Sequence, residues 1–235
     1  MRALEPWVEE ITLQRSDVSM IVLPPDPATT LVWRINAAGE SDVLIAGPRT
    51  KASYHSGKEL PVCLRLRIRP GQAMPLLGIA ADELVDRIVP LSDVCTTAAG
   101  LSERLDRDHP EQAVAVIGSH LLERVPRRLP ERFELIGEAV EELSSRRSVG
   151  ETATRLGVSD RYLRRIFRQA VGLSPKHFAR IARVRGLISE NQRSWSTAAA
   201  GAGYADQSHL IADFRALMRV TPAAFATGRV PVTNC

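Results

Sequence analysis

Residues 157–168 read GVSDRYLRRIFR, and residues 203–215 read GYADQSHLIADFR. Each stretch opens with a glycine, follows it within three residues by Ser or Asp, and continues with apolar residues at helical spacing. Glycine adopts a positive φ without strain after a helix, and a Ser or Asp side chain caps the helix that follows. Both stretches therefore predict a turn and then a helix. The expected core residues are Leu163, Ile166 and Phe167 in the first helix, and Leu210, Phe214 and Leu217 in the second.

These stretches belong to a longer internal repeat. A small residue, Ala153 or Ala199, comes four residues before each glycine, where a preceding helix would cross the next one closely. LSPKHF at 173–178 is echoed by VTPAAF at 220–225. Ser-Pro or Thr-Pro starts a helix well, because proline in the first turn loses no hydrogen bond. The repeat predicts two helix-turn-helix units joined by one long helix over residues 174–192, with Trp195 anchoring the first helix of the second unit in the core.

Residues 133–225 resemble the DNA-binding domain of AraC-type transcriptional regulators. The resemblance rests on GYADQSHL at 203–210, on Phe214-Arg215 and on TPAAF at 221–225. It implies an all-α domain of seven helices whose two recognition helices enter successive major grooves on one face of the duplex. The function that it implies is sequence-specific DNA binding by a transcription regulator.

The family's base-reading positions fall on Arg161, Arg164 and Arg165 in the first unit, and arginine forks onto guanine in the major groove. In the second unit, Ala212 stands where relatives usually have Arg. The neighbouring Asp213 is expected to face phosphates and to weaken this unit's contacts. The expected DNA-binding residues are Arg161, Arg164, Arg165, Arg168, Gln207, Ser208, His209 and Arg215.

Charge divides the chain into two parts. Residues 1–129 hold 15 Lys and Arg against 17 Asp and Glu, whereas residues 130–235 hold 16 against 10. Within residues 144–193 the counts are 12 basic and 3 acidic. Such a run could be no more than a solvated helix face. Its concentration on the first recognition helix and the connecting helix favours a surface that faces phosphates.

The N-terminal part has the pattern of a β-rich domain. Four apolar runs, separated by Pro, Gly and Asp, predict strands, and a helical pattern follows from Pro75 through residues 84–88, 91–105 and 110–122. In the clearest run, alternation places Leu64, Leu66 and Ile68 on one face and arginines on the other. The expected strands span residues 11–23, 28–35, 42–46 and 62–68.

This part resembles, through short pieces, the cupin-like domain that precedes many AraC-type DNA-binding domains. The pieces are LIAGP at 44–48, RIRPG at 67–71, LGI at 77–79 and DRIVPLSD at 86–93. We therefore predict an α+β protein. Its parts are a cupin-like sensing or dimerisation domain with trailing helices at 1–125, a linker at 126–130, a double helix-turn-helix domain at 131–228 and a tail at 229–235. Residues 130–235 are expected to fold alone and to bind DNA.

Several other kinds of site are disfavoured by the residues. His55 lacks the further His and Glu that a cupin metal centre needs, so no metal and no cofactor are expected. The three cysteines, Cys63, Cys95 and Cys235, show no paired spacing. Cys63 falls on the arginine face of its strand, as a structural or exposed cysteine or, less favoured, as a redox-sensitive thiol. Nothing in the sequence assembles a catalytic constellation, so an enzyme is not expected.

The sequence thus predicts a cytoplasmic transcription regulator, since it shows no signal peptide and no apolar run long enough to span a membrane. Its expected partner is double-stranded DNA. RNA polymerase, a small-molecule effector and a second copy of the chain are further partners that the sequence leaves open. The alternative is a ligand-binding or protein-interaction module whose DNA binding is weak or vestigial.

Overall fold

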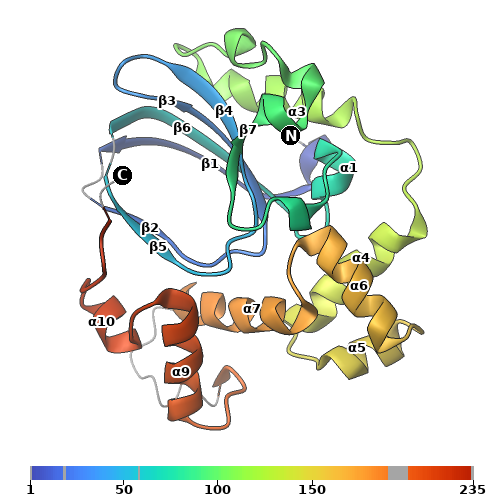
Figure 1. Cartoon of the computed structure of the whole chain (residues 1–235). Coiled ribbons are helices and arrows are strands. Elements are labelled where there is room, and N and C mark those ends of the chain that lie inside the picture. The colour runs from blue at the N-terminus through green and yellow to red at the C-terminus, as the bar shows by residue number, and fades with distance from the viewer. Residues whose placement is uncertain (1, 18–19, 58, 190–200, 234–235) are drawn as a thin grey trace.

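The computed structural model describes residues 2–17, 20–57, 59–189 and 201–233. A β-rich half with short helices lies above a helical half, and one long helix runs along the boundary between them (Figure 1). This arrangement confirms the predicted α+β class, with β-structure and trailing helices first and helix-turn-helix units last.

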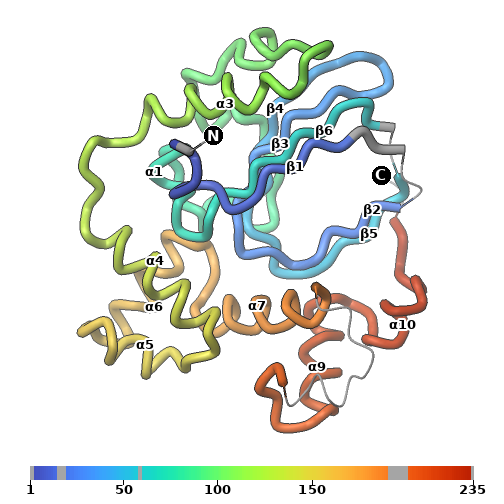
Figure 2. The backbone as a smooth tube through the Cα atoms, turned by 180° about the vertical axis from the view of Figure 1, so that it is seen from behind, coloured from blue at the N-terminus to red at the C-terminus, as the bar shows by residue number. Residues whose placement is uncertain are grey.

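The β-rich half contains two antiparallel sheets. One has five strands in the order β1-β6-β3-β4-β7, and the other is the pair β2-β5. Seen from both sides, the pair lies opposite the larger sheet and next to the helical half (Figure 2). The strands are β1 (Val8–Asp17), β2 (Met20–Leu23), β3 (Thr29–Ile35), β4 (Ser41–Ala46), β5 (Ser53–Ser56), β6 (Glu59–Ile68) and β7 (Ile88–Pro90).

The apolar residues of β6 lie on one face of the strand, as predicted from their alternation. Leu64, Leu66 and Ile68 are fully buried in one cluster with residues of helices α1 (Ala73–Leu77) and α3 (Ala113–Leu122). The opposite face of β6 carries arginines, which line a hollow rather than an open surface. A strand can alternate apolar and charged residues and still have both faces covered.

Several predicted strands and helices differ in detail from the structure. The run at 11–23 forms two strands of different sheets, β1 and β2, and β5 was not predicted. Ile88 lies on strand β7, where its side chain is exposed, and not on a helix. The predicted helix at 91–105 is broken into short pieces, because no segment there keeps an apolar stripe over three turns. These pieces are α2 (Leu91–Val94) and the 3-10 turns η3 (Thr96–Ala98) and η4 (Ser102–Arg104); the other 3-10 turns are η1 (Arg2–Leu4), η2 (Ala81–Glu83) and η5 (Pro110–Gln112).

The helical half follows the predicted repeat. Its described helices are α4 (Glu131–Ser144), α5 (Val149–Arg155), α6 (Asp160–Val171), α7 (Pro175–Ser189), α9 (Gln207–Met218) and α10 (Pro222–Ala226). Helix α7 connects the two units, which lie at its opposite ends (Figure 1). The predictions for Trp195 and Ala199 fall outside the described residues. No helix in the described part of the chain is long and apolar enough to cross a membrane.

The two halves share a hydrophobic cluster. Ala52 and Tyr54, from the β2-β5 side, are buried in the same cluster as Leu210, Phe214 and Leu217 of α9. A second close approach lies at the other end of α7, where a Cβ on Gly71 would come within 2.5 Å of the Ile136 side chain of α4. The two halves therefore contact each other near both ends of the connecting helix.

Candidate nucleic-acid interface

The turns and caps of both units have the predicted geometry. Gly157 and Gly203 have positive φ angles of 66° and 73°. The Ser159 hydroxyl accepts a hydrogen bond from the Tyr162 N–H at 3.2 Å, and the Asp206 carboxylate accepts one from the His209 N–H at 2.7 Å. Each cap supplies a partner to one of the unpaired N–H groups at the start of a recognition helix.

Each recognition helix is held by an aromatic pair at echoed positions. The Phe167 and Phe178 ring centroids lie 5.3 Å apart in the first unit, and those of Phe214 and Phe225 lie 5.8 Å apart in the second, both in edge-on geometry. The predicted core residues of both helices are buried, with exposed fractions of 6% or less: Leu163, Ile166, Phe167, Leu210, Phe214 and Leu217.

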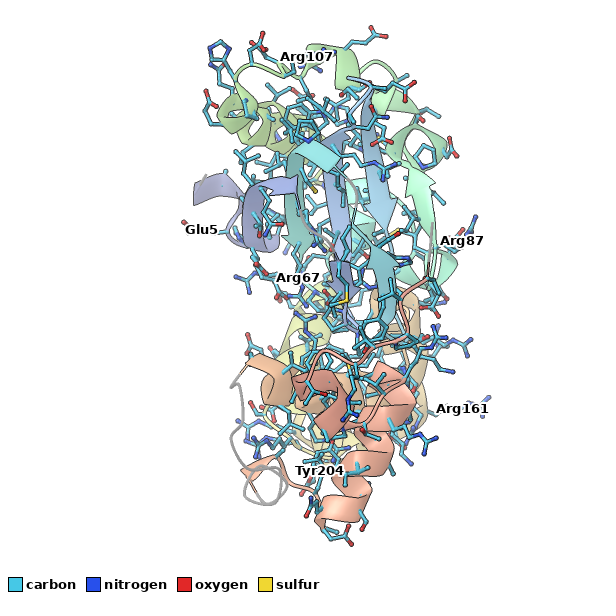
Figure 3. All side chains as sticks on the ribbon, turned by 90° about the vertical axis from the view of Figure 1, so that its left-hand side faces the viewer. Glu5, Arg67, Arg87, Arg107, Arg161 and Tyr204 are labelled. Atoms are coloured by element: carbon cyan, nitrogen blue, oxygen red, sulfur yellow. The ribbon has the colours of Figure 1, made fainter. Side chains whose placement is uncertain are left out.

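The outer face of α6 is strongly cationic. Arg161, Arg164, Arg165 and Arg168 are all exposed, and Figure 3 shows Arg161 projecting away from the body of the molecule. Arg164 pairs with Asp160 one turn earlier, at 2.9 Å. The Arg165 guanidinium lies 5.2 Å from the centroid of the Tyr162 ring. Both contacts are on the surface, so DNA could replace them at little cost.

The outer face of α9 is polar but less charged. Gln207, Ser208, His209 and Arg215 are exposed, as is Ala212. The His209 ring packs edge-on against the Tyr204 ring, with centroids 5.2 Å apart. The two recognition helices thus present different chemistry on equivalent faces.

The prediction that Asp213 faces phosphates is wrong. Its side chain is buried and pairs with Arg180 at 2.8 Å and with Arg183 at 3.7 Å, both on α7. The reason is helical spacing: position 213 is three residues after Leu210 and adjacent to Phe214, on the side that meets α7. Asp213 therefore fixes the second unit to the connecting helix and leaves the outer face of α9 free of negative charge at that position.

The connecting helix also differs from the prediction. Three of its arginines are half-buried and each pairs with a buried carboxylate, so they are not the free cations of a phosphate-facing surface. Arg180 and Arg183 pair with Asp213, and Arg185 pairs with Asp26 of the β-rich half at 3.3 Å. The basic run therefore overstates the charge that is free to contact DNA.

A basic hollow of about 560 Å³ lies between the two units. Of its five cationic residues, sequence reasoning singled out Arg164 alone, although all five belong to the basic run at 144–193. Arg146, at a positive φ of 71°, donates a hydrogen bond to the Gly201 carbonyl and so links the first unit to the turn of the second. The cationic side chains that line the hollow are Arg146, Arg147, Arg164, Lys176 and Arg183.

A second polar hollow, of about 210 Å³, lies inside the β-rich half and is bounded on one side by Arg185 of α7. Asp26 is the buried carboxylate in the lining of this hollow. Its carboxylate accepts a hydrogen bond from Arg67 Nε at 3.0 Å. Burial alone would raise the pKa of Asp26, but the hydrogen bond from Arg67 and the charges of Arg67 and Arg185 outweigh it and lower the pKa. Figure 3 shows Arg67 near the level where the two halves meet.

The cysteine of β6 is not an exposed thiol. Cys63 is 9% exposed, and burial raises its pKa, although the neighbouring arginines Arg65 and Arg34 act in the opposite direction. A raised pKa disfavours the reactive thiolate. The hypothesis of a redox-sensitive cysteine at this position therefore has no support in the structure.

A comparison with known protein families agrees with this geometry. A family model described as a helix-turn-helix domain matches residues 152–228, which include both turns and both recognition helices. Residues 152–228 therefore form a helix-turn-helix domain, as expected from the resemblance of the sequence to AraC-type DNA-binding domains. A helix-turn-helix domain places its second helix in the major groove of DNA, so this part of the chain has the build of a DNA-binding domain.

The overall chain course is similar to that of solved structures of ToxT from Vibrio cholerae. An apo ToxT variant of strain SCE256, with one lysine replaced by alanine, is 13% identical, with 92% of this chain and 100% of that chain covered and a TM-score of 0.46. ToxT of strain O395 bound to (E)-4-(8-methylnaphthalen-1-yl)but-3-enoic acid is 11% identical, with 94% and 98% covered and the same TM-score. Among curated proteins, none matches this chain.

Proposed function

We propose that the protein is a sequence-specific transcription regulator that inserts α6 and α9 of its AraC-type domain into two successive major grooves. The observation that carries the proposal is the pair of matched units, each with a capped helix whose outer face is polar and exposed. Helix α7 has 15 residues and is about 22 Å long. With the width of a helix at each end, this length is comparable to the roughly 34 Å between successive major grooves.

The proposed roles follow from side-chain chemistry. Arg161, Arg164 and Arg165 would fork onto guanine, and Gln207 would pair with adenine. Ser208 and His209 would contact base edges beside Gln207. Arg168 and Arg215 lie farther along their helices, where phosphate contact suits an arginine.

We propose that the chain consists of a sensing or dimerisation domain at 1–125, a linker at 126–130, the DNA-binding domain at 131–228 and a tail at 229–235. The AraC-type domain expressed alone should still bind DNA through α6. Without Ala52 and Tyr54, which bury part of α9, its second unit should be the less stable of the two. We place the protein in the cytoplasm with its DNA, and contact with RNA polymerase and homodimerisation belong to the same proposal.

Salt dependence tests the DNA-binding proposal. Binding to DNA from the region upstream of the protein's own gene should weaken with salt, with a log–log slope of about −0.9 per phosphate contacted. Arg168→Ala should reduce the slope by about one such contact, whereas Lys51→Ala, at an exposed position of the β-rich half, should leave it unchanged. Affinity that is flat with salt would favour the alternative, a ligand-binding or interaction module with vestigial DNA binding.

A second candidate function concerns the hollow around Asp26. The charged side chains that line the polar hollow are four arginines, Arg49, Arg65, Arg67 and Arg185, and two acids, Glu10 and the buried Asp26. Since this cationic excess surrounds a partly enclosed space, we propose that the hollow takes a small anionic effector. A thermal-shift panel of small carboxylates and phosphates tests this: a rise in melting temperature that is lost in Arg67→Met supports the effector site, and a rise kept in that variant places binding elsewhere.

A further inference from the structure

The β-rich half touches the C-terminal ends of both recognition helices. At the end of α6, a Cβ on Gly172 would lie 2.8 Å from the carbonyl oxygen of Ala81 in η2. At the end of α9, the Leu217 carbonyl accepts a hydrogen bond from the Ala52 N–H at 2.8 Å, and the Met218 carbonyl accepts one from the Tyr54 hydroxyl at 2.6 Å. One half of the molecule therefore holds both helices that face DNA.

The contact at α9 satisfies a general need of helix ends. The last four carbonyls of an α-helix have no partner within the helix. In α9 the Arg215 carbonyl is satisfied by the Arg219 N–H at 2.9 Å, and the last two carbonyls are satisfied by the other half of the protein. Tyr54 is 1% exposed, and burial raises its pKa to about 12, so the hydroxyl keeps its proton and donates.

The tail strengthens the same joint. The Thr233 N–H donates to the Tyr54 carbonyl at 2.9 Å, and the Ser56 N–H donates to the Thr233 carbonyl at 3.2 Å. The end of the described chain thus lies along β5 (Figure 2), where it bonds to the Tyr54 backbone. Strand β5 is held by α9 on one side and by the tail of the AraC-type domain on another.

The two contacts are joined through a short path inside the β-rich half. Asp86, soon after η2, accepts hydrogen bonds from the N–H of Thr50 at 2.7 Å and from its hydroxyl at 2.6 Å. Thr50 is two residues before Ala52, which binds the end of α9. The segments that support α6 and α9 are therefore connected by hydrogen bonds and a few residues of chain.

We propose that Tyr54 is a positioning residue for DNA recognition: through the end of α9 it sets the placement of the second recognition helix relative to the first. The consequence is that Tyr54, far from any base, determines the spacing between the two halves of the DNA site. This inference rests on the proposed function, because it concerns how the same DNA-binding surface is used.

A library of DNA sites in which the spacer between the two half-sites varies by single base pairs tests the role. Wild-type protein should select one spacer strongly. Tyr54→Phe removes only the hydroxyl, and the ratio of binding between the preferred spacer and its neighbours should fall about fivefold, which is the typical effect of one hydrogen bond. Thr50→Val, at a half-buried position, removes the hydroxyl bond to Asp86 and keeps the backbone one, so it should broaden the profile in the same direction but less.

Tyr204→Phe is a matched control. Tyr204 is also buried in the cluster around α9, and burial also raises its pKa to about 12, but its hydroxyl has no hydrogen-bond partner among the described residues. Its spacer profile should equal that of wild type. A profile unchanged in both Tyr54→Phe and Thr50→Val, while wild type still selects DNA, overturns the positioning role alone. Failure of wild type to select any site overturns the proposed function and this inference with it.

Discussion

The two helix-turn-helix units share their local chemistry and differ in what surrounds them. Each has a positive-φ glycine, a capped recognition helix and an edge-on aromatic pair. The first unit packs its core with α4 and exposes four arginines on α6, whereas the second shares its core with the β-rich half. The repeat therefore keeps the elements that form each unit, while the neighbours decide how each unit is used.

The acidic residues show the difference most clearly. Asp160 in the first unit is exposed and pairs with Arg164 of its own helix, whereas Asp213 in the second is buried and pairs with two arginines of α7. An acidic residue in a recognition helix can therefore lie on the exposed surface or in the core. Which of the two occurs depends on the side of the helix on which its position falls.

The largest expected effect is the difference in stability lost when each of these two acids is replaced. Asp213→Ala leaves Arg180 and Arg183 without their partner and should lower the free energy of unfolding by about 3 kcal/mol. Asp160→Ala removes only a surface pair and should cost at most about 1 kcal/mol. Urea unfolding of the two variants measures the difference, and equal losses would mean that Asp213 is not the joint between the second unit and α7.

The next effect concerns DNA affinity. Arg164→Ala should cost roughly 1–3 kcal/mol of discrimination at one half of the site, the typical worth of a bidentate contact to guanine, and Gln207→Ala should cost less. Because Asp213 is occupied by α7, Ala212→Arg should tighten binding without losing the new guanidinium to that carboxylate. Titrations on a randomised operator library rank the variants. A larger loss in Gln207→Ala than in Arg164→Ala would make the second unit the principal reader.

The caps should behave alike in the two units. Ser159→Ala and Asp206→Ala each remove one hydrogen bond at a helix start, which typically costs about 1 kcal/mol. The comparison is sharpened by measuring hydrogen exchange of the amides of α6 and α9 in both variants. Each variant should loosen its own helix, and a loss of protection in both helices from either change would show that the units unfold together.

The smallest effect is a pH dependence that arises from His177, at the start of α7. His177 corresponds to Ala224 in the repeat, and its burial, together with the charge of Arg180, lowers its pKa. Because the unfolded chain takes up this proton at a pH of about 6.5, the histidine's contribution to stability is complete above that pH. It is lost as the pH falls through about 6.5 toward the lower pKa of the folded state.

His177→Gln should therefore flatten the loss of stability on acidification, as measured by urea midpoints across this pH range. The urea midpoint of the variant should still fall somewhat on acidification, since burial also lowers the pKa of His120. Wild type and variant with equal slopes would show that His177 does not titrate in this way.

The sequence was sufficient for the features that depend on local chemistry. The glycine turns at 157 and 203, the caps at Ser159 and Asp206 and the core of both recognition helices were predicted, because capping and helical periodicity act within a few residues. Strand β5 was not predicted, since SYHS has no apolar alternation and pairs with β2 only through the fold. The burial of Cys63 and Asp213 could not be predicted from their neighbours in sequence, because it depends on which element covers each face.

The close contact at Gly172 and the capped end of α9 have a practical consequence for protein engineering. A chimaera that transfers residues 131–228 to another sensor domain would leave the Leu217 and Met218 carbonyls without their donors. The transplanted sensor would also have to reproduce the close approach to Gly172, where a Cβ would lie 2.8 Å from the Ala81 carbonyl oxygen. Designs that carry β5 and the segment from Ala81 to Asp86 along with the graft should succeed more often than designs that cut at the linker.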